Sequence, residues 1–305
     1  KILKDMVVRS QQMLGHDAPY IPGWDCHGLP IEWKIEEKYR QQGKDKDDIP
    51  IIDFRQECRN FASEWVKIQK EEFKRLGVIG NWENPYLTMD FSAEAVIAEE
   101  FQKFLMNGAL FQGSKPVMWS PVEKTALAEA EIEYHDHKSD TIWVPFTIIK
   151  GSKALKNVKV VIWTTTPWTI PSNKAIAYNK DISYGIYVVK ETQQESWTKV
   201  NDLYLIANSL AEETLTKARV TKFQKIQNVD NNELNDTICC HPFNAVENAK
   251  GFWDYDVPII EGEHVNEEAG TGFVHTAPSH GADDYECFVK RGWIDQLTHN
   301  IGEAS

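Results

Sequence analysis

Two prolines in one stretch restrict the backbone of this chain more than any other feature. Residues 163–173 read Trp-Thr-Thr-Thr-Pro-Trp-Thr-Ile-Pro-Ser-Asn and follow a short β-branched apolar run at 158–162, which predicts a buried strand. Pro167 and Pro171 each fix φ and lack an N–H, so the strand ladder cannot continue. The hydroxyl groups of this stretch belong to Thr164, Thr165, Thr166 and Thr169. A stiff loop with clustered hydroxyls suits a polar ligand, although threonines capping turns at a strand edge would give the same pattern.

A second stretch, residues 270–285, places two histidines and two carboxylates in a glycine-rich loop. It predicts a short strand at 273–274 and a helix that is closed by Gly292. Asp283 and Asp284 then lie in the first helical turn, where the helix dipole favours negative charge. Plain helix capping would explain one of these two carboxylates. His275 or His280 alone would be an ordinary hydrogen-bonded group near the surface.

The secondary structure that the sequence predicts changes near residue 138, from mainly helical to mainly β. Helical periodicity at 1–14 and 31–40, with a strand and loop between them, predicts part of a parallel α/β sheet. The loop carries Gly-Trp-Asp-Cys-His-Gly-Leu-Pro, in which Asp25 and His27 would by themselves be turn and loop residues. From about residue 139 short β-like runs dominate, which predicts a mixed β-barrel with a few short helices. The expected fold class is therefore α/β, with domains at 1–137 and 138–305.

Charge and cysteine content exclude several classes of function. The 305 residues carry a net charge of −13, which argues against broad, nonspecific nucleic-acid binding. No apolar run is long enough to cross a bilayer, so we expect no membrane partner. The five cysteines form no Cys-x-x-Cys pair, which indicates a reducing, cytoplasmic setting without a zinc site or disulfide framework. A nucleotide-binding oxidoreductase is disfavoured because no Gly-x-Gly-x-x-Gly follows a strand.

Taken together, three peptides resemble those of isoleucine-type class Ia aminoacyl-tRNA synthetases. They are Trp-Thr-Thr-Thr-Pro-Trp-Thr, Gly-Thr-Gly…His-Thr-Ala-Pro…Gly-x-Asp-Asp-Tyr and Gly-Trp-Asp-Cys-His-Gly-Leu-Pro-Ile-Glu. Valine and leucine enzymes have Arg-Pro in place of the first Thr-Pro. The resemblance implies a partial Rossmann-like catalytic domain at 1–137 and an inserted editing (CP1) domain at 138–305, truncated at its C-terminus. It implies that the chain is an internal fragment of an enzyme that attaches isoleucine to tRNA(Ile) with ATP and Mg²⁺.

The resemblance also implies roles for individual residues. Asp25 would hold the α-ammonium of the amino acid, and His27 belongs to the same signature. In the editing domain the threonines at 164–166 would position the ester and a water, while Asp284 would bind the α-ammonium of misattached valine. The remaining substrate-binding residues would be Thr169; Asn173, against the substrate or the terminal ribose; and His275, which would exclude isoleucine.

The metal, cofactor and partner predictions follow from the same resemblance. Many relatives bind a structural zinc with a Cys-x-x-Cys where this chain has Ser120 and Glu123, so we expect no metal. We expect no cofactor in this chain. The expected partners are the acceptor end of tRNA(Ile), isoleucine and valine, with a monomeric parent enzyme in the cytoplasm.

The synthetic reaction is not expected of this chain, because neither His-Ile-Gly-His nor Lys-Met-Ser-Lys-Ser occurs in it. Hydrolysis of Val-tRNA(Ile) is the expected activity. The alternatives are a noncatalytic tRNA-binding fragment, a free-standing trans-editing hydrolase and the editing domain of a valine- or leucine-type enzyme. A deacylation assay with valyl-, isoleucyl- and leucyl-tRNA separates them.

Overall fold

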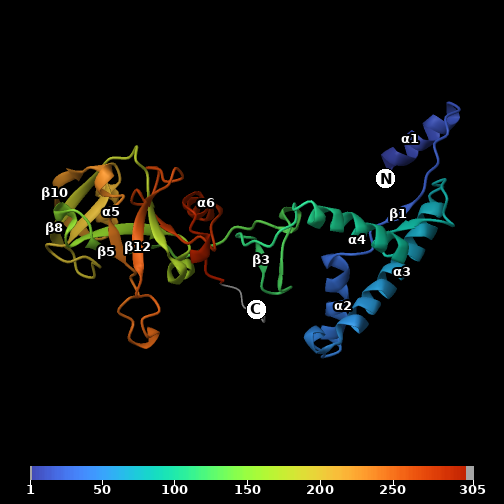
Figure 1. Ribbon diagram of the computed structural model, residues 1–305, viewed down its shortest axis with the longest axis horizontal. Helices are drawn as coiled ribbons and strands as arrows, with labels where there is room; N and C mark the ends of the chain where they lie inside the picture. Colours follow the sequence, from blue (N-terminus) through green and yellow to red (C-terminus); the bar gives the residue numbers. More distant parts are fainter. Residues whose placement is uncertain (1, 300–305) are drawn as a thin grey trace. The chain divides into compact units, whose positions relative to one another are not determined.

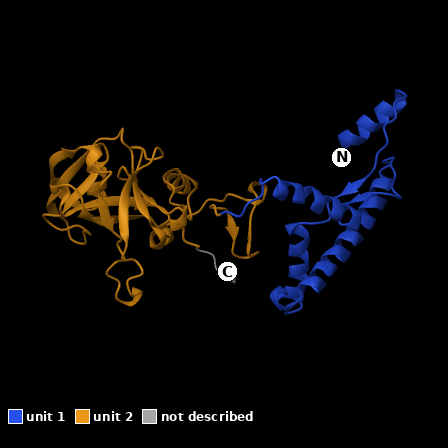
Figure 2. Ribbon diagram, viewed as in Figure 1, with its two compact units in different colours: residues 1–113 blue, residues 114–305 orange. Residues whose placement is uncertain are grey.

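The computed structural model describes residues 2–299 and divides the chain into two compact units, residues 1–113 and 114–305 (Figure 2). We call them unit 1 and unit 2. The boundary between the units lies before residue 138, where the predicted secondary structure changes, because residues 114–137 belong to the same unit as the sheet that follows them. The limits of the two functional domains, 1–137 and 138–305, stay a prediction.

Unit 1 consists mainly of helices (Figure 1). Its main elements are α1 (Ile2–Met13), β1 (Gly23–Trp24), α2 (Leu29–Gln41), α3 (Ile51–Arg75), β2 (Tyr86–Leu87) and α4 (Phe91–Met106). The short strands β1 and β2 pair in parallel. This pairing agrees with the parallel α/β arrangement that the helix–strand–loop–helix order predicts. Within residues 2–299, no helix combines the length and apolar character that a membrane span requires.

Local sequence explains the start of α2. Pro30 lies in the first turn, where its missing N–H costs nothing and its fixed φ is already helical. Gly28 precedes the helix with φ of 111°, a conformation that side chains rarely adopt. The core of unit 1 is small and contains Cys26, Ala62, Val66 and Met89.

Unit 2 is built around a large sheet and also contains a separate two-stranded sheet of β3 (Trp119–Ser120) and β4 (Thr125–Ala126). The strands of the large sheet are β5 (Ile142–Lys150), β6 (Val158–Thr164), β7 (Ala175–Tyr178), β8 (Tyr184–Thr192), β9 (Leu203–Ala207), β10 (Val220–Val229), β11 (Ile238–Cys240), β12 (Asp256–Glu261) and β13 (Phe273–Thr276). Its α-helices are α5 (Ala211–Lys217) and α6 (Ala282–Arg291), and the 3₁₀ helix η4 (Pro167–Ser172) follows β6.

The nine-stranded sheet is mixed and open. Its order is β10-β8-β9-β6-β5-β11-β12-β7-β13, with parallel pairing at β6–β9 and β12–β7 and antiparallel pairing elsewhere. The prediction of a closed barrel was wrong. β10 and β13 are edges of the sheet, and no ladder joins them in the part of the chain that the structure describes. The sheet instead bends so that β13 lies beside β6. Alternating apolar residues predict which face is buried, but they do not determine which edge strands pair.

A large core fills the bend of the sheet, and a second, smaller apolar cluster lies between the sheet and α5. Phe146, Ile162, Tyr184, Phe273 and Phe288 are at most 2% exposed and belong to one apolar cluster. The edge strand β10 is mostly exposed, and its pairing with β8 is interrupted by three register shifts. The core therefore holds β6, β13 and α6 together, and these are the elements that carry the two predicted site segments.

Candidate functional site

The ladder between β7 and β13 brings the two predicted segments together. β13 pairs antiparallel with β7, so that His275 lies opposite Ile176 and Thr276 lies opposite Ala175. The N–H of Lys174 continues this pairing by donating to Thr276 O at 2.9 Å. Since Asn173 immediately precedes this pairing, residues about a hundred positions apart in the chain become neighbours. The sequence prediction did not specify this ladder.

Hydrogen bonds hold both ring nitrogens of His275. Thr169 Oγ1 donates to Thr166 O at 2.8 Å, so it must accept from His275 Nε2, which lies 2.9 Å away. The amide of Asn173 donates through Nδ2 to His275 Nδ1 at 2.7 Å. His275 is therefore a neutral imidazole with its proton on Nε2. Burial, with smaller contributions from the neighbouring His280 and His241, lowers the pKa of His275 to about 4.

Asn173 supports His275 from a fully buried position. Its Nδ2 also donates to Ala175 O at 2.8 Å, which fixes the orientation of the amide because a carbonyl can only accept. Its Oδ1 has no hydrogen-bond partner among the described residues. Contact of Asn173 with a substrate or ribose stays a prediction. The observed contacts make it a residue that orients His275.

The threonines differ in what their hydroxyls are free to do. Thr164 is buried, and its Oγ1 accepts the N–H of Thr166 at 3.0 Å. Thr165 is exposed and Thr166 half-buried, and their hydroxyls meet each other at 3.4 Å. Within residues 2–299 these two hydroxyls have no other hydrogen-bond partner. Thr165 and Thr166 are thus the hydroxyls best placed to contact a ligand, whereas Thr164 and Thr169 stabilise the loop.

Asp284 lies in the first turn of α6 and is tied to the end of β13. Its Oδ2 accepts the N–H of Ala277 at 2.9 Å. Burial raises the pKa of Asp284, and the Ala277 hydrogen bond opposes that shift. Its Oδ1 lies 3.9 Å from His264 Nε2, which is beyond hydrogen-bond distance. Asp284 therefore has one occupied oxygen and one that can accept a donor.

The neighbours of Asp284 were missed by sequence reasoning. His264 reaches it from the loop after β12, and Cys287 Sγ lies 3.9 Å from His264 Nδ1. A Cβ at position 281 would lie 2.9 Å from Asp284 Oδ2, so glycine leaves room for the carboxylate in its present position. Neither His264 nor Cys287 stands in a motif, so only the fold reveals them. Asp283 is exposed in the first turn of α6, and among the described residues no side chain caps that helix start by a hydrogen bond, so capping by Asp283 stays a prediction.

The structure joins the two segments through His275. No hydrogen bond or ion pair in the described part of the chain connects Asp284 with the threonines at 164–166. The link is through β13: Asp284 is tied to Ala277, two residues beyond His275, and His275 is bound to Thr169 and Asn173.

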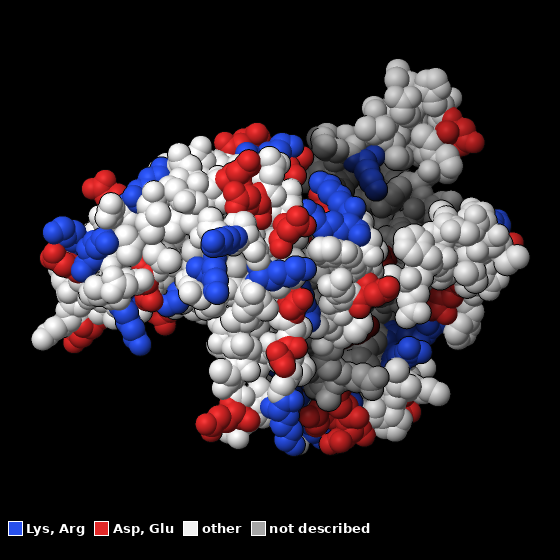
Figure 3. Space-filling model, turned by 60° about the vertical axis from the view of Figure 1, so that its left-hand side comes forward, with Lys and Arg blue, Asp and Glu red and all other residues white. Residues whose placement is uncertain are grey.

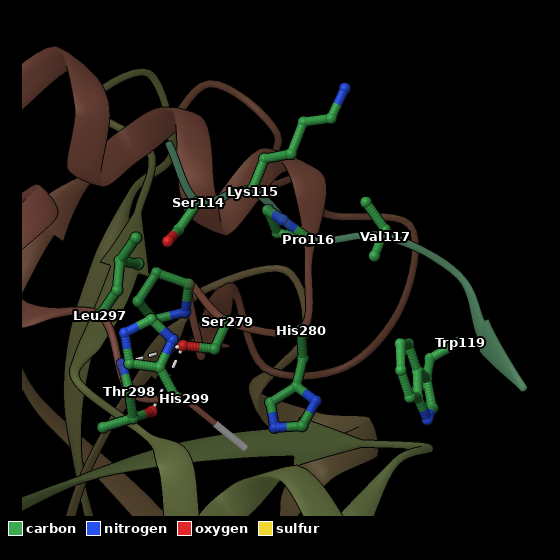
Figure 4. A pocket seen from close by; sticks show the side chains of 11 residues that line it. Ser114, Lys115, Pro116, Val117, Trp119, Ser279, His280, Leu297, Thr298 and His299 are labelled. Atoms are coloured by element: carbon green, nitrogen blue, oxygen red, sulfur yellow. Dashed lines mark hydrogen bonds between the residues drawn. The ribbon is translucent and has the colours of Figure 1, made fainter. Parts of the chain in front are cut away.

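A cavity of about 280 Å³ lies beside the N-terminal end of α6. Figure 4 shows its lining, where the ring of His280 lies between Ser279 and Trp119. The hydroxyls of Ser279 and Thr298 are 3.3 Å apart on one wall. His280 is four residues before Asp284, so this hollow is close in sequence to the carboxylate. Among residues 2–299, no group of three or more His, Cys, Asp or Glu side chains is arranged to hold a metal ion.

The two site residues predicted in unit 1, Asp25 and His27, both interact with Thr88. Asp25 Oδ1 accepts from Thr88 Oγ1 and from the N–H of His27, each at 3.4 Å. The ring of His27 lies 3.1 Å from Thr88 O, and Thr88 Oγ1 also accepts the N–H of Cys26 at 2.8 Å. Asp25 is exposed, while Cys26 and His27 line a cavity of about 530 Å³ within unit 1. Sequence reasoning missed Thr88.

The surface carries charges of both signs. Figure 3 shows Lys and Arg side chains interspersed with Asp and Glu on the visible face. That face presents no continuous basic patch, in keeping with the net charge of −13. Recognition of an anionic polymer by this face would therefore depend on local contacts more than on a broad field.

Comparison with known proteins gives consistent matches. A family model described as tRNA synthetases class I (I, L, M and V) matches residues 1–241. Isoleucine–tRNA ligase of Ruegeria pomeroyi is 55% identical over 304 residues, or 99% of this chain and 31% of that protein. The same enzyme of Caulobacter vibrioides is 54% identical over 296 residues, or 96% of this chain and 30% of that protein. The chain thus spans about 30% of the length of these curated relatives.

Solved structures match more weakly. GlLeuRS-CP1 has a TM-score of 0.38 and 16% identity, covering 50% of this chain and 59% of that chain. The LeuRS–tRNA–LeuAMS ternary complex of Agrobacterium radiobacter K84 has a TM-score of 0.36 and 15% identity, covering 93% of this chain and 37% of that chain.

Proposed function

Since this chain belongs to the class I tRNA synthetases (I, L, M and V), we propose that it functions within an isoleucine–tRNA ligase. In this proposal, residues 138–305 hydrolyse valine that has been wrongly esterified to tRNA(Ile). A site that must distinguish valine from isoleucine by one methylene gains only about 1–3 kcal/mol from an apolar pocket. A second site that hydrolyses the smaller ester and excludes the larger one supplies the missing selectivity.

The observation that carries the proposal is the fixation of His275 by Thr169 and Asn173, at 2.9 and 2.7 Å. With both ring nitrogens occupied and its pKa lowered to about 4 by burial, His275 has no free lone pair at neutral pH. It is therefore not the general base of a hydrolysis. A rigid, neutral ring suits a wall that limits the size of a bound side chain, which is the role the family resemblance implies.

Asp284 is the group we assign to the α-ammonium of the bound amino acid. Its Oδ2 is held by Ala277 N–H, so the carboxylate is oriented, and Oδ1 remains available. Burial raises the pKa of the unliganded Asp284 carboxyl, and an ammonium at Oδ1 would lower that pKa again. Amino-acid binding would thereby be coupled to ionisation of Asp284.

The hydroxyls of the exposed Thr165 and the half-buried Thr166 complete the proposed site. They would position the ester and the attacking water, a task that needs orientation more than a strong nucleophile. In unit 1 we propose a partial Rossmann-like domain in which Asp25 binds the ammonium of isoleucine. ATP and Mg²⁺ would serve the synthetic reaction of the whole enzyme.

The deciding experiment compares two adjacent carboxylates. Asp284→Ala should abolish hydrolysis of Val-tRNA(Ile), because the ammonium loses its partner. Asp283→Ala is the matched control and should retain activity, since Asp283 is exposed. Wild-type chain should hydrolyse valyl-tRNA and spare isoleucyl- and leucyl-tRNA. Full activity of Asp284→Ala would remove this residue from the site, and tRNA binding without hydrolysis by the wild type would establish the noncatalytic alternative.

A further inference from the structure

The loop between β11 and β12 packs against η4 and Asn173, which carry the residues that hold His275. Residues 241–255 project below β12 in Figure 1. They carry a cluster of aromatic rings. His241 is fully buried and stacks on Trp253, with ring centroids 5.9 Å apart and planes 11° apart. Phe243 and Tyr255 pack on the same imidazole at 5.4 and 5.5 Å. The rings therefore form one unit, although their residues stand at opposite ends of the loop.

Three ring donors of this cluster bind carbonyls at the end of η4. The bonds run from His241 Nε2 to Ile170 O at 3.0 Å, from Trp253 Nε1 to Pro171 O at 2.9 Å and from Tyr255 Oη to Asn173 O at 2.5 Å. We call His241, Trp253 and Tyr255 the aromatic brace. No other element donates three side-chain hydrogen bonds to η4 and Asn173 in the described residues.

All three donors keep their protons at neutral pH. His241 Nδ1 accepts the N–H of Phe243 at 3.1 Å, so the proton must be on Nε2. Burial lowers the pKa of His241, which keeps the ring neutral, and burial raises the pKa of Tyr255 to about 12. The indole N–H of Trp253 does not titrate. The brace is thus a permanent set of neutral donors.

The end of η4 has few backbone donors of its own. Pro167 and Pro171 lack N–H groups, and the Ile170 carbonyl accepts the N–H of Asn173 at 3.0 Å. Asn173 is fully buried and its carbonyl receives its donor from Tyr255, whereas a buried carbonyl without a donor costs about 1–3 kcal/mol. The brace supplies donors from outside, and it also fixes the backbone that carries Thr169 and Asn173, the two residues that hold His275.

We propose that the aromatic brace positions Thr169 and Asn173, and through them sets the orientation of His275 and the discrimination between valyl and isoleucyl esters. His241, Trp253 and Tyr255 are positioning residues in this account, because their contacts are to the backbone of η4 and Asn173. The proposal rests on the function proposed above for its effect on hydrolysis. Its structural part, the control of His275 by the brace, is independent of that function.

The test removes two donors and keeps their rings. The double variant Trp253→Phe/Tyr255→Phe should lower kcat for Val-tRNA(Ile) about tenfold, since two hydrogen bonds are lost. KM should change little, and the ratio of valyl to isoleucyl hydrolysis should fall. The matched control is Trp197→Phe/Tyr187→Phe, which removes a partly exposed indole and a tyrosine hydroxyl bonded to Asn208. The control should keep the wild-type ratio.

A second measurement reads His275 directly. Nitrogen-15 NMR of the labelled imidazole should show one Nε2–H tautomer in the wild type and a mixture of tautomers in the brace variant. A simple loss of folded protein would reduce hydrolysis of both esters in proportion and leave their ratio unchanged, which would overturn the proposal. An unchanged ratio with an unchanged tautomer would also overturn it. If the wild type hydrolyses neither ester, the proposed function fails, and the NMR result alone decides the role of the brace.

Discussion

Unit 2 buries most of its large apolar side chains, whereas unit 1 leaves many exposed. Phe146, Phe273 and Phe288 in unit 2 are at most 2% exposed, while Phe91 and Phe101 on α4 are 79% and 57% exposed. Both units show apolar periodicity in their sequence. In unit 2, apolar side chains from strands that are distant in sequence pack together and are buried. In unit 1, the apolar faces of α1 and α4 are largely exposed, and α3 buries only Ala62 and Val66. Periodicity therefore identifies a face to be buried, but not what buries it.

Separation of the two units should give the largest effect. Residues 114–305 alone should unfold in one cooperative thermal transition, because one large apolar core involves most of their strands. Residues 1–113 alone should show helical circular dichroism without a cooperative transition, and should bind a hydrophobic dye, since their buried core is so small. A sharp melting transition in residues 1–113 would show that unit 1 has a cooperative core of its own.

Truncation of one phenylalanine in each unit sharpens the comparison. Phe288→Ala should lower the free energy of unfolding by about 3–5 kcal/mol, because it opens a cavity in the core. Phe101→Ala should change the free energy of unfolding by only about 0.5 kcal/mol, since the side chain is 57% exposed. Urea titration of both variants measures the difference. Equal losses would mean that α4 is covered in solution.

A pH titration tests the buried histidine of unit 2. The pKa of His275 falls from 6.5 to about 4 on folding, so the unfolded chain binds the extra proton between those values. Unit 2 should therefore lose stability as pH falls from about 6.5 to 4, by about 3 kcal/mol in total. His275→Gln should flatten this dependence, as measured by urea midpoints across the pH range. An unchanged slope in the variant would assign the effect to other groups.

The smallest effect is expected from removing the hydrogen bonds of Thr88 in unit 1. Thr88→Val keeps the shape of the side chain but removes the acceptor for Cys26 N–H and the donor to Asp25. Loss of one such bond should cost about 1 kcal/mol, which corresponds to roughly fivefold faster hydrogen exchange at the Cys26 amide. Ser63→Ala, a change elsewhere in unit 1, should leave that amide unaffected. Unaltered exchange in Thr88→Val would show that Thr88 does not hold the loop.

The local elements followed from the sequence to a large extent. The helices expected at 1–14 and 31–40 are α1 and α2, and the strand expected at 158–162 lies within β6. Apolar spacing and the positions of proline and glycine are local signals, so they predict local structure. Closure of the sheet was predicted wrongly, because edge pairing depends on contacts between distant strands that no local pattern records.

Part of the site could be predicted, and part could not. The motifs indicated His275 and Asp284, and the roles of these residues in a reaction stay predictions. The bonds that fix His275 to Thr169 and Asn173 depend on the β7–β13 ladder, which is a property of the fold. His241, Tyr255 and His264 stand in no recognised peptide, so their contacts to the site emerge only when the loops are placed in space.

The open edge of the sheet has a consequence for solubility. Among the described residues β10 pairs with β8 alone, so its outer side presents backbone groups on which another chain could polymerise. Exposed Lys222 and Lys225, together with the three breaks in register against β8, make that edge charged and irregular. The outermost strand of this unclosed sheet is thus a poor template for further growth.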